Sequence, residues 1–166
     1  FQNPHCIENS LEKLRALYEL GIRVVQMTYN KANYIGSGCL ETKDSGLTDF
    51  GRQALKAMNR LGMVEDGSHC GPQTTLDIIR YSEKPVVISH AGAAAVTPNV
   101  RNKSDEALKL LKENGGVIGL SPWGPLCWKP ETGKRPTMDD YLDHVDYVVN
   151  LIGIDHVGFG GDSTLD

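Results

Sequence analysis

Hydrophobic positions along the chain follow two different spacings. Apolar residues three or four positions apart predict amphipathic helices, and short continuous apolar runs rich in Val and Ile predict buried strands. Ser or Thr before a helix and Gly after it mark several of the boundaries. These patterns predict helices over residues 7–20, 49–61, 73–82, 105–113 and 137–151, and strands over residues 22–28, 63–68, 85–89, 117–120 and 156–161.

The predicted order is a regular alternation of helices and strands, which makes the chain an α/β protein. The strand segments are apolar nearly throughout, as strands must be in a parallel sheet that is covered on both faces. Such a series predicts either an open doubly wound sheet or part of a barrel. No G-x-G-x-x-G follows a strand, which weighs against a nucleotide-binding sheet.

Size and charge narrow the possible partners. The chain has 166 residues, 40% of them hydrophobic, which is enough for one domain. The formal net charge is -4 and no basic stripe with interleaved aromatic residues occurs, so nucleic acid is not an expected partner. No apolar run reaches the roughly 18–20 residues of a membrane span. The chain opens at Phe1 and ends at Asp166 within predicted structure, so we interpret residues 1–166 as a single domain truncated at both ends.

The cysteines show no metal or redox motif. No two of them are spaced as C-x-x-C, and we expect scattered reduced thiols, as in a cytosolic protein. This favours a cytoplasmic location, although the sequence leaves the compartment open. Cys70 adjoins His69, but no nearby base or helix start favours a nucleophile there. The four cysteines are Cys6, Cys39, Cys70 and Cys127.

Polar side chains gather at the carboxyl ends of the predicted strands. Tyr29 and Asn30 follow the first strand, His69 the second, His90 the third, and Asp162 the last. Barrel enzymes place their catalytic groups at this rim. Two histidines on adjacent strands can share one metal ion, and an aspartate facing them can serve as ligand or general base. A single histidine at a strand end can also be a packed core residue, but the combination favours a metal site.

Four stretches resemble the renal or membrane dipeptidase family of metallopeptidases. They are GLTDFGRQALKAMNRLGMVEDGSHCG (46–71), PVVISHAG (85–92), the pair Arg101-Asn102, and HVGFGGD (156–162). The order and spacing of these stretches agree with the family over nearly the whole chain. The resemblance implies a distorted (β/α)8, TIM-barrel-like fold, of which this chain covers a part, and a two-zinc centre that hydrolyses dipeptides.

The resemblance also implies roles for individual residues. His69 and His90 would bind one of the two zinc ions. Arg101, with Asn102 beside it, would contact the substrate, the guanidinium gripping a carboxylate. Asp162 would handle protons during the attack of water.

The chain departs from the family pattern at two site positions. Gln2 stands where the family has the glutamate that bridges the two metal ions, and a neutral amide is a poor bridge. Tyr29 stands where the family has a substrate-contacting histidine, although a phenol can still donate a hydrogen bond to an oxyanion. The family's H-x-D pair, which binds the other zinc, would precede Phe1. The cofactor is therefore expected to be one or two Zn2+ ions, with the second in doubt.

We therefore predict a metal-dependent, dipeptidase-like hydrolase that cleaves the peptide bond of a small dipeptide-type substrate. Because Gln2 replaces the bridging carboxylate, a barrel that binds a small ligand without catalysis is one alternative. A single-metal amidohydrolase acting on another amide or ester is a second. Another metal-dependent amidohydrolase barrel, with H-x-H on its first strand, is a third. We expect the 166-residue chain by itself to be inactive.

Other polar and aromatic residues allow more than one interpretation. His144 lies in a helix rich in aspartate, which predicts a solvated face. Glu65 and Asp66 precede His69 and could support a metal ligand, or Glu65 could point toward the helices. Trp123 and Trp128 could line the substrate cleft or contact another subunit, as in a homodimer.

Overall fold

Five parallel strands form one sheet in which spatial order equals chain order. The computed structural model describes residues 1–162, and residues 163–166 lie outside the described part. Doubly wound sheets reverse their strand order at a switch point, whereas a barrel adds each strand beside the previous one. The uninterrupted order is therefore that of a barrel segment. The strands are β1 (Val24–Gln26), β2 (Val64–Asp66), β3 (Val87–Ala91), β4 (Val117–Leu120) and β5 (Val157–Phe159).

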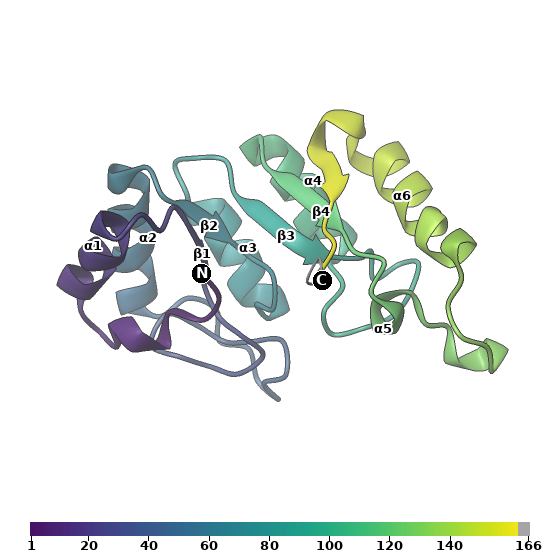
Figure 1. Cartoon of the computed structure of the whole chain (residues 1–166), viewed down its shortest axis with the longest axis horizontal. Coiled ribbons are helices and arrows are strands. Elements are labelled where there is room, and N and C mark those ends of the chain that lie inside the picture. Colours follow the sequence, from purple (N-terminus) through teal and green to yellow (C-terminus); the bar gives the residue numbers. More distant parts are fainter. Residues whose placement is uncertain (163–166) are drawn as a thin grey trace.

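Helices connect successive strands and flank the sheet. Figure 1 shows α1 and α2 at one end of the molecule and α6 at the other, with the strands between them. The helices are α1 (Leu11–Glu19), α2 (Asp49–Leu61), α3 (Pro72–Tyr81), α4 (Asp105–Asn114), α5 (Gly124–Cys127) and α6 (Met138–Ile152), and the 3-10 turns are η1 (Pro4–Ile7), η2 (Pro130–Thr132) and η3 (Ile154–His156).

Capping residues fix most helix boundaries where the sequence predicts them. Thr48 Oγ1 accepts a hydrogen bond from Gly51 N at 2.8 Å, and α2 ends at Gly62, whose φ of 74° is left-handed. The predicted capping box at Thr137 and Asp140 starts α6. The first predicted helix is too long, because Ser10 caps a helix that begins only at Leu11. The short helix α5 is an addition to the loop predicted over residues 121–136.

The core lies between the sheet and its helices. Most residues of β1 to β4 and the inward faces of the long helices are buried there, and this apolar burial is the main favourable contribution to folding. The largest of these side chains include Leu14, Leu55, Met58, Ile78, Ile88, Leu108, Leu111 and Ile118. Among residues 1–162, no helix has both the length and the apolar character to cross a bilayer.

His144 belongs to this core, so the predicted solvated face is wrong at this residue. Its side chain is 1% exposed. Its Nδ1 accepts a hydrogen bond from Ala93 N at 2.9 Å, and its Nε2 lies 3.2 Å from Thr97 Oγ1. His144 precedes the buried Val148 and Ile152 by one and two helical turns, so it shares their face. The exposed acidic residues of α6, Asp139, Asp143 and Asp146, lie on other faces.

A bulge interrupts the pairing of β3 with β4. Ile88 pairs with Ile118 and Ala91 with Leu120, so Ser89 and His90 together stand opposite Gly119. A Cβ at Gly119 would collide with the carbonyl oxygen of Ser89. Bulges redirect side chains at strand ends. The two residues at the bulge are the two that reach the candidate site from β3.

Candidate active site

His69 follows β2 in a tight turn and is held by two neighbours. Its backbone φ is 61°, in the left-handed region that few non-glycine residues adopt. Its Nδ1 lies 2.7 Å from Asn30 Oδ1, and the ring of Tyr29 stacks on it with centroids 4.2 Å apart. The loop after β1 therefore sets the orientation of the imidazole.

His90 is held by a relay that ends in a buried carboxylate. Its Nδ1 lies 2.8 Å from Ser89 Oγ, and the Ser89 hydroxyl makes a short hydrogen bond to Asp66 Oδ2. Asp66 Oδ1 also accepts from Ser68 N at 2.8 Å and Ser89 N at 3.0 Å. Partners of this kind fix the orientation and tautomer of metal-binding histidines.

These partners determine where the imidazole protons lie. Asn30 Oδ1 can only accept, so Nδ1 of His69 carries the hydrogen. The single hydrogen of the Ser89 hydroxyl goes to the Asp66 carboxylate, so Nδ1 of His90 donates to Ser89 Oγ. In neutral rings both Nε2 atoms then carry lone pairs, and they face each other at 2.9 Å.

The environment keeps both rings neutral. Burial, together with the charges of Arg101, His90 and Lys103, lowers the pKa of His69 to about 3. Burial also lowers the pKa of His90, and this effect outweighs the opposing charge of Asp162. Neutral imidazole is the form that binds a metal.

The two lone pairs fit a cation such as zinc. Two nitrogen ligands of one tetrahedral zinc ion, each at about 2.0–2.1 Å, are separated by roughly 3.3 Å. The distance between the two Nε2 atoms is close to this value. Residues 1–162 contain no group of three or more His, Cys, Asp or Glu side chains arranged to hold an ion. The described residues thus bring two candidate nitrogen ligands together.

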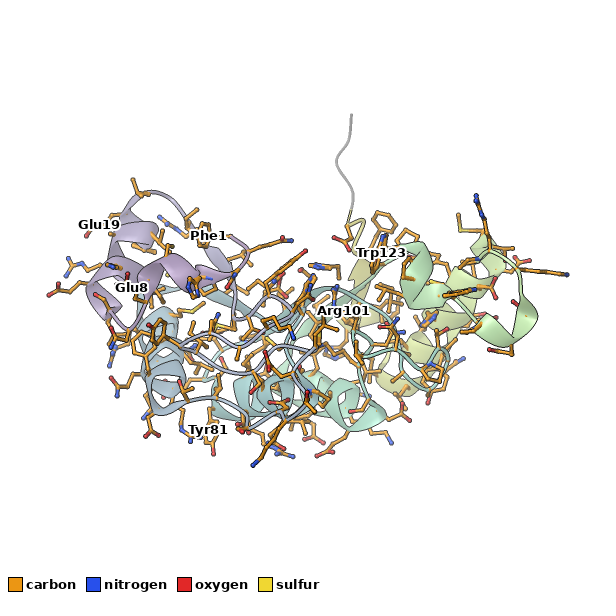
Figure 2. All side chains as sticks on the ribbon, turned by 90° about the horizontal axis from the view of Figure 1, so that it is seen from below. Phe1, Glu8, Glu19, Tyr81, Arg101 and Trp123 are labelled. Carbon is orange, nitrogen blue, oxygen red and sulfur yellow. The ribbon has the colours of Figure 1, made fainter. Side chains whose placement is uncertain are left out.

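Asp162 and Arg101 flank the histidine pair. Asp162 Oδ1 lies 3.9 Å from Nε2 of His90, and its φ of 51° is left-handed. Arg101 is buried, and its Nη2 donates to the carbonyl oxygen of His90 at 3.3 Å. Its Nε has no hydrogen-bond partner among the described residues. Figure 2 shows Arg101 near the middle of the molecule with Trp123 beside it, and Tyr81 on the opposite side.

A cavity of about 400 Å³ joins these residues. Its walls combine polar groups from the strand ends with apolar side chains from two loops. Trp123 therefore borders the same space as the predicted site, whereas Trp128 lines a separate groove near residues 133–136. The lining residues are Tyr29, Asn30, Leu40, His69, Asn99, Arg101, Trp123, Pro125 and Asp162.

Three predicted site residues are absent from the cavity lining, and of these only His90 contacts it indirectly, through the ring of His69. Gln2 is exposed and pairs as an isolated parallel bridge with Gln26 on β1. Asn102 is buried, its Oδ1 accepting from Gly92 N at 2.8 Å and its Nδ2 donating to Thr97 O and Leu126 O, each at 2.9 Å. The amide of Asn102 is therefore fully used by the backbone.

The structure also settles where the side chain of Glu65 points and bears on the reactivity of Cys70. Glu65 points toward the helices, where Asn59 Nδ2 hydrogen-bonds to it. The two other histidines of the chain also lie away from the cavity: His5 is exposed, and His156 Nδ1 hydrogen-bonds to Gly116 O at 2.8 Å just before β5. Burial raises the pKa of Cys70 to about 11, which argues against a thiolate nucleophile.

The sequence of the chain corresponds to a known family. The model of the membrane dipeptidases, peptidase family M19, matches residues 1–164. The chain belongs to the membrane dipeptidase family. It is thus a member of a metallopeptidase family, and the resemblance expected from the sequence is confirmed.

Curated membrane dipeptidase relatives match nearly all of the chain. An uncharacterised dipeptidase of Schizosaccharomyces pombe is 35% identical over 162 residues, which are 95% of this chain and 39% of that protein. The dipeptidase tcpJ of Claviceps purpurea is 39% identical over 165 residues, covering 95% of this chain and 37% of its own length. The chain therefore spans less than half the length of these relatives.

Solved structures confirm the TIM-barrel-like α/β fold of the chain. An amidohydrolase from Pseudomonas aeruginosa matches with a TM-score of 0.90 and 39% identity, over 99% of this chain and 50% of that one. A metallo peptidase from Rhodobacter sphaeroides, liganded with a phosphinate mimic of the dipeptide L-Ala-D-Ala, matches with a TM-score of 0.85 and 30% identity. That match covers 93% of this chain and 46% of the other.

The sequence analysis missed two residues that contact the histidine pair or its turn. Asn30 stood in the sequence at the right strand end, and asparagine is common at left-handed positions such as its own, where φ is 60°. Lys103 gave no signal at all, because lysine is almost always exposed. It is nevertheless buried beside the His69 turn.

Proposed function

We propose that the protein carrying this chain is a metal-dependent dipeptidase that hydrolyses the peptide bond of a small dipeptide-like substrate. The observation that carries the proposal is the convergence of the Nε2 lone pairs of His69 and His90, 2.9 Å apart, beside a cavity bordered by Arg101 and Asp162. Family membership gives the reaction class.

The imidazoles of His69 and His90 would hold the ion, and zinc suits their nitrogen donors. A bound ion supplies Lewis-acid polarisation of the scissile carbonyl. Asn30 and the Ser89–Asp66 relay keep both rings in the tautomer that binds metal. Because Gln2 replaces the bridging glutamate of the family, we propose that one ion is bound more tightly than any second.

Arg101 would bind the free carboxylate of the substrate. Its guanidinium is buried, borders the cavity and leaves Nε without a partner among residues 1–162. An unpaired cationic donor in a buried position is costly unless an anion arrives to pair with it. A dipeptide carries such an anion at its carboxyl end, which is why we favour unblocked dipeptides as substrates.

Asp162 would move the proton. Its carboxylate borders the cavity and lies within 3.9 Å of Nε2 of His90. From there it can accept a proton from the attacking water and return it to the leaving amine. Tyr29, half exposed at the cavity wall, can donate its phenolic hydrogen to the oxyanion that develops on the carbonyl.

The test is to measure bound metal and dipeptide hydrolysis in the protein that carries this chain. We expect zinc to co-purify and unblocked dipeptides to be hydrolysed. We expect H69A and H90A to lose both, because each leaves a single nitrogen ligand. H156A removes a histidine far from the cavity and serves as the control. We expect R101M to keep zinc while its KM for dipeptides rises.

The metal count separates the alternatives. Two ions per chain indicate the ordinary two-metal chemistry of the family, and one ion indicates a variant hydrolase. No bound metal, with H69A indistinguishable from the parent, contradicts the proposal and favours a barrel that only binds a small ligand. Hydrolysis of other amides or esters but not of dipeptides contradicts the proposed substrate class and leaves the proposed metal site standing.

We also propose that residues 1–166 form one part of a complete (β/α)8 barrel. The strictly sequential strand order and the greater length of the relatives support this. The remaining strands would then supply the metal ligands that residues 1–162 do not provide.

A further inference from the structure

Lys103 is a buried lysine with no part in the mechanism above. It lies between β3 and α4, and its side chain is almost inaccessible, with a residue exposure of 4%. Its Nζ donates to Gly67 O at 2.9 Å, to Cys70 O at 3.1 Å and to Thr75 Oγ1 at 3.0 Å. An ammonium group has three hydrogens, so all of its donors are used.

Two of the three acceptors bracket a metal ligand. Gly67 and Cys70 are the first and last residues of the turn that contains His69. Within the turn, Cys70 N donates to Gly67 O at 3.3 Å, and His69 adopts its left-handed φ of 61°. A non-glycine residue holds that conformation only where its surroundings enforce it. The ammonium binds both ends of the turn from one side and so helps to enforce it.

The backbone of Lys103 is tied to the other metal ligand. Its N donates to Gly92 O, and its own carbonyl oxygen accepts from Ala94 N, both at 2.9 Å. Gly92 lies two residues after His90. The side chain of Lys103 thus contacts the His69 segment while its backbone contacts the His90 segment, so one residue links the two, beside the direct hydrogen bond from His90 N to Ser68 Oγ at 3.0 Å.

The charge of Lys103 is unusual in this position. Lysine is rarely buried unless it is paired with an anion, and no carboxylate of residues 1–162 forms an ion pair with it. Burial accordingly lowers the pKa of Lys103. If the only requirement at this position were to fill space, an apolar side chain would satisfy it. Only a donor to several acceptors at once satisfies the two turn carbonyls together.

We infer that Lys103 is a positioning residue for the metal site. Its ammonium holds residues 67–70 in the turn that brings Nε2 of His69 to face Nε2 of His90. This inference rests on the proposed metal site, and it adds a third supporting group to Asn30 and the Ser89–Asp66 relay.

The test compares zinc affinities of folded variants of the protein that carries this chain. Competition with a chromogenic chelator gives the zinc Kd, and circular dichroism monitors folding. We expect K103M to bind zinc about 10–100-fold more weakly, the usual effect of losing a group that orients a metal ligand. K109M removes an exposed lysine of α4 and should leave the Kd within about twofold.

A second control separates positioning from stability. L111A removes a buried core side chain remote from the cavity, so it should lower the Tm without changing the zinc Kd of the folded protein. A merely structural Lys103 would give the same result in K103M. If K103M does not fold, K103R decides the question, because the planar guanidinium keeps the charge but not the geometry of three divergent donors.

Each outcome has a distinct meaning. Weaker zinc binding in folded K103M or in K103R, with unchanged binding in L111A, supports the inference. Zinc affinity equal to that of the parent in K103M, or in K103R where K103M does not fold, overturns it and leaves the proposed function intact. Absence of zinc binding in the parent overturns both.

Discussion

The carboxyl group of Glu65 should make the stability of this protein depend on pH. Glu65 is completely buried on the helix-facing side of β2. Its Oε1 accepts a short hydrogen bond from Asn59 Nδ2, and its Oε2 lies 3.3 Å from Ser82 Oγ. The Ser82 hydroxyl is closer to Lys84 O, at 2.8 Å, and donates there. A protonated Glu65 can therefore donate to Ser82 Oγ, whereas an ionised one faces a lone pair.

The magnitude follows from the pKa. Burial raises the pKa of Glu65 from 4.5 to about 7. Because the folded state binds this proton more tightly than the unfolded state, the contribution to stability is complete below pH 4.5 and is lost as the pH rises to about 7. At about 1.4 kcal/mol per pKa unit, the loss amounts to about 3 kcal/mol. Above that range the contribution no longer changes.

The assay is urea denaturation of the parent and of E65Q between pH 4.5 and pH 8. Glutamine has the shape of the protonated acid and donates through Nε2 without titrating. The pH-dependent contributions of the other ionisable groups to the free energy of unfolding cancel in the difference between the two proteins. We expect E65Q to gain about 3 kcal/mol relative to the parent across this range. E113Q, at an exposed position of α4, should show no such trend. A difference between parent and E65Q that stays constant with pH would refute the reasoning.

Three further predictions concern the relay behind His90, the bulge between β3 and β4, and the buried His144. D66N should weaken zinc binding about 10–100-fold, and chelator competition measures this. The amide oxygen is needed to accept from Ser68 N and Ser89 N, which places the Nδ2 donor against Ser89 Oγ, so the Ser89 hydrogen loses the acceptor that sets the tautomer of His90. G119A should cost about 1–3 kcal/mol in urea denaturation, because its methyl group meets the carbonyl oxygen of Ser89, and an unchanged midpoint would contradict the bulge geometry. H144A should cost about 2–4 kcal/mol by the same measurement, since it leaves a cavity and an unpaired Ala93 N. H144N should cost less, because its Oδ1 can accept from that nitrogen, and equal losses in the two variants would show that the hydrogen bond contributes little.

Local signals predicted most of the fold. The helix over residues 49–61 and the strand over residues 117–120 have the bounds read from the sequence, because Thr48, Gly62 and a short apolar run define them. The barrel-like strand order was not accessible from periodicity alone. It needed either the family resemblance or the observed pairing of neighbouring strands.

The sequence predicted which strand ends form the site, but not which residues hold the two histidine rings in place. The sequence placed His69 and His90 at neighbouring ends, and the structure brings their Nε2 atoms together. The partners of these rings arise from tertiary contacts between loops, which no local spacing encodes. His144 is different, because its spacing from Val148 and Ile152 carried the signal. Counting charged neighbours along the chain, instead of positions on the helix face, led to the wrong prediction.

The backbone at the two positions proposed to bind the metal differs in a way that matters for redesign. His69 requires a left-handed conformation, which asparagine, aspartate and glycine tolerate but β-branched residues do not. His90 lies in a strand, where most side chains are accepted. An engineer who wishes to change the preferred ion by exchanging a ligand should therefore begin with libraries at residue 90. At residue 69, the left-handed backbone conformation disfavours most other residue types, so few alternative ligands could be tested there.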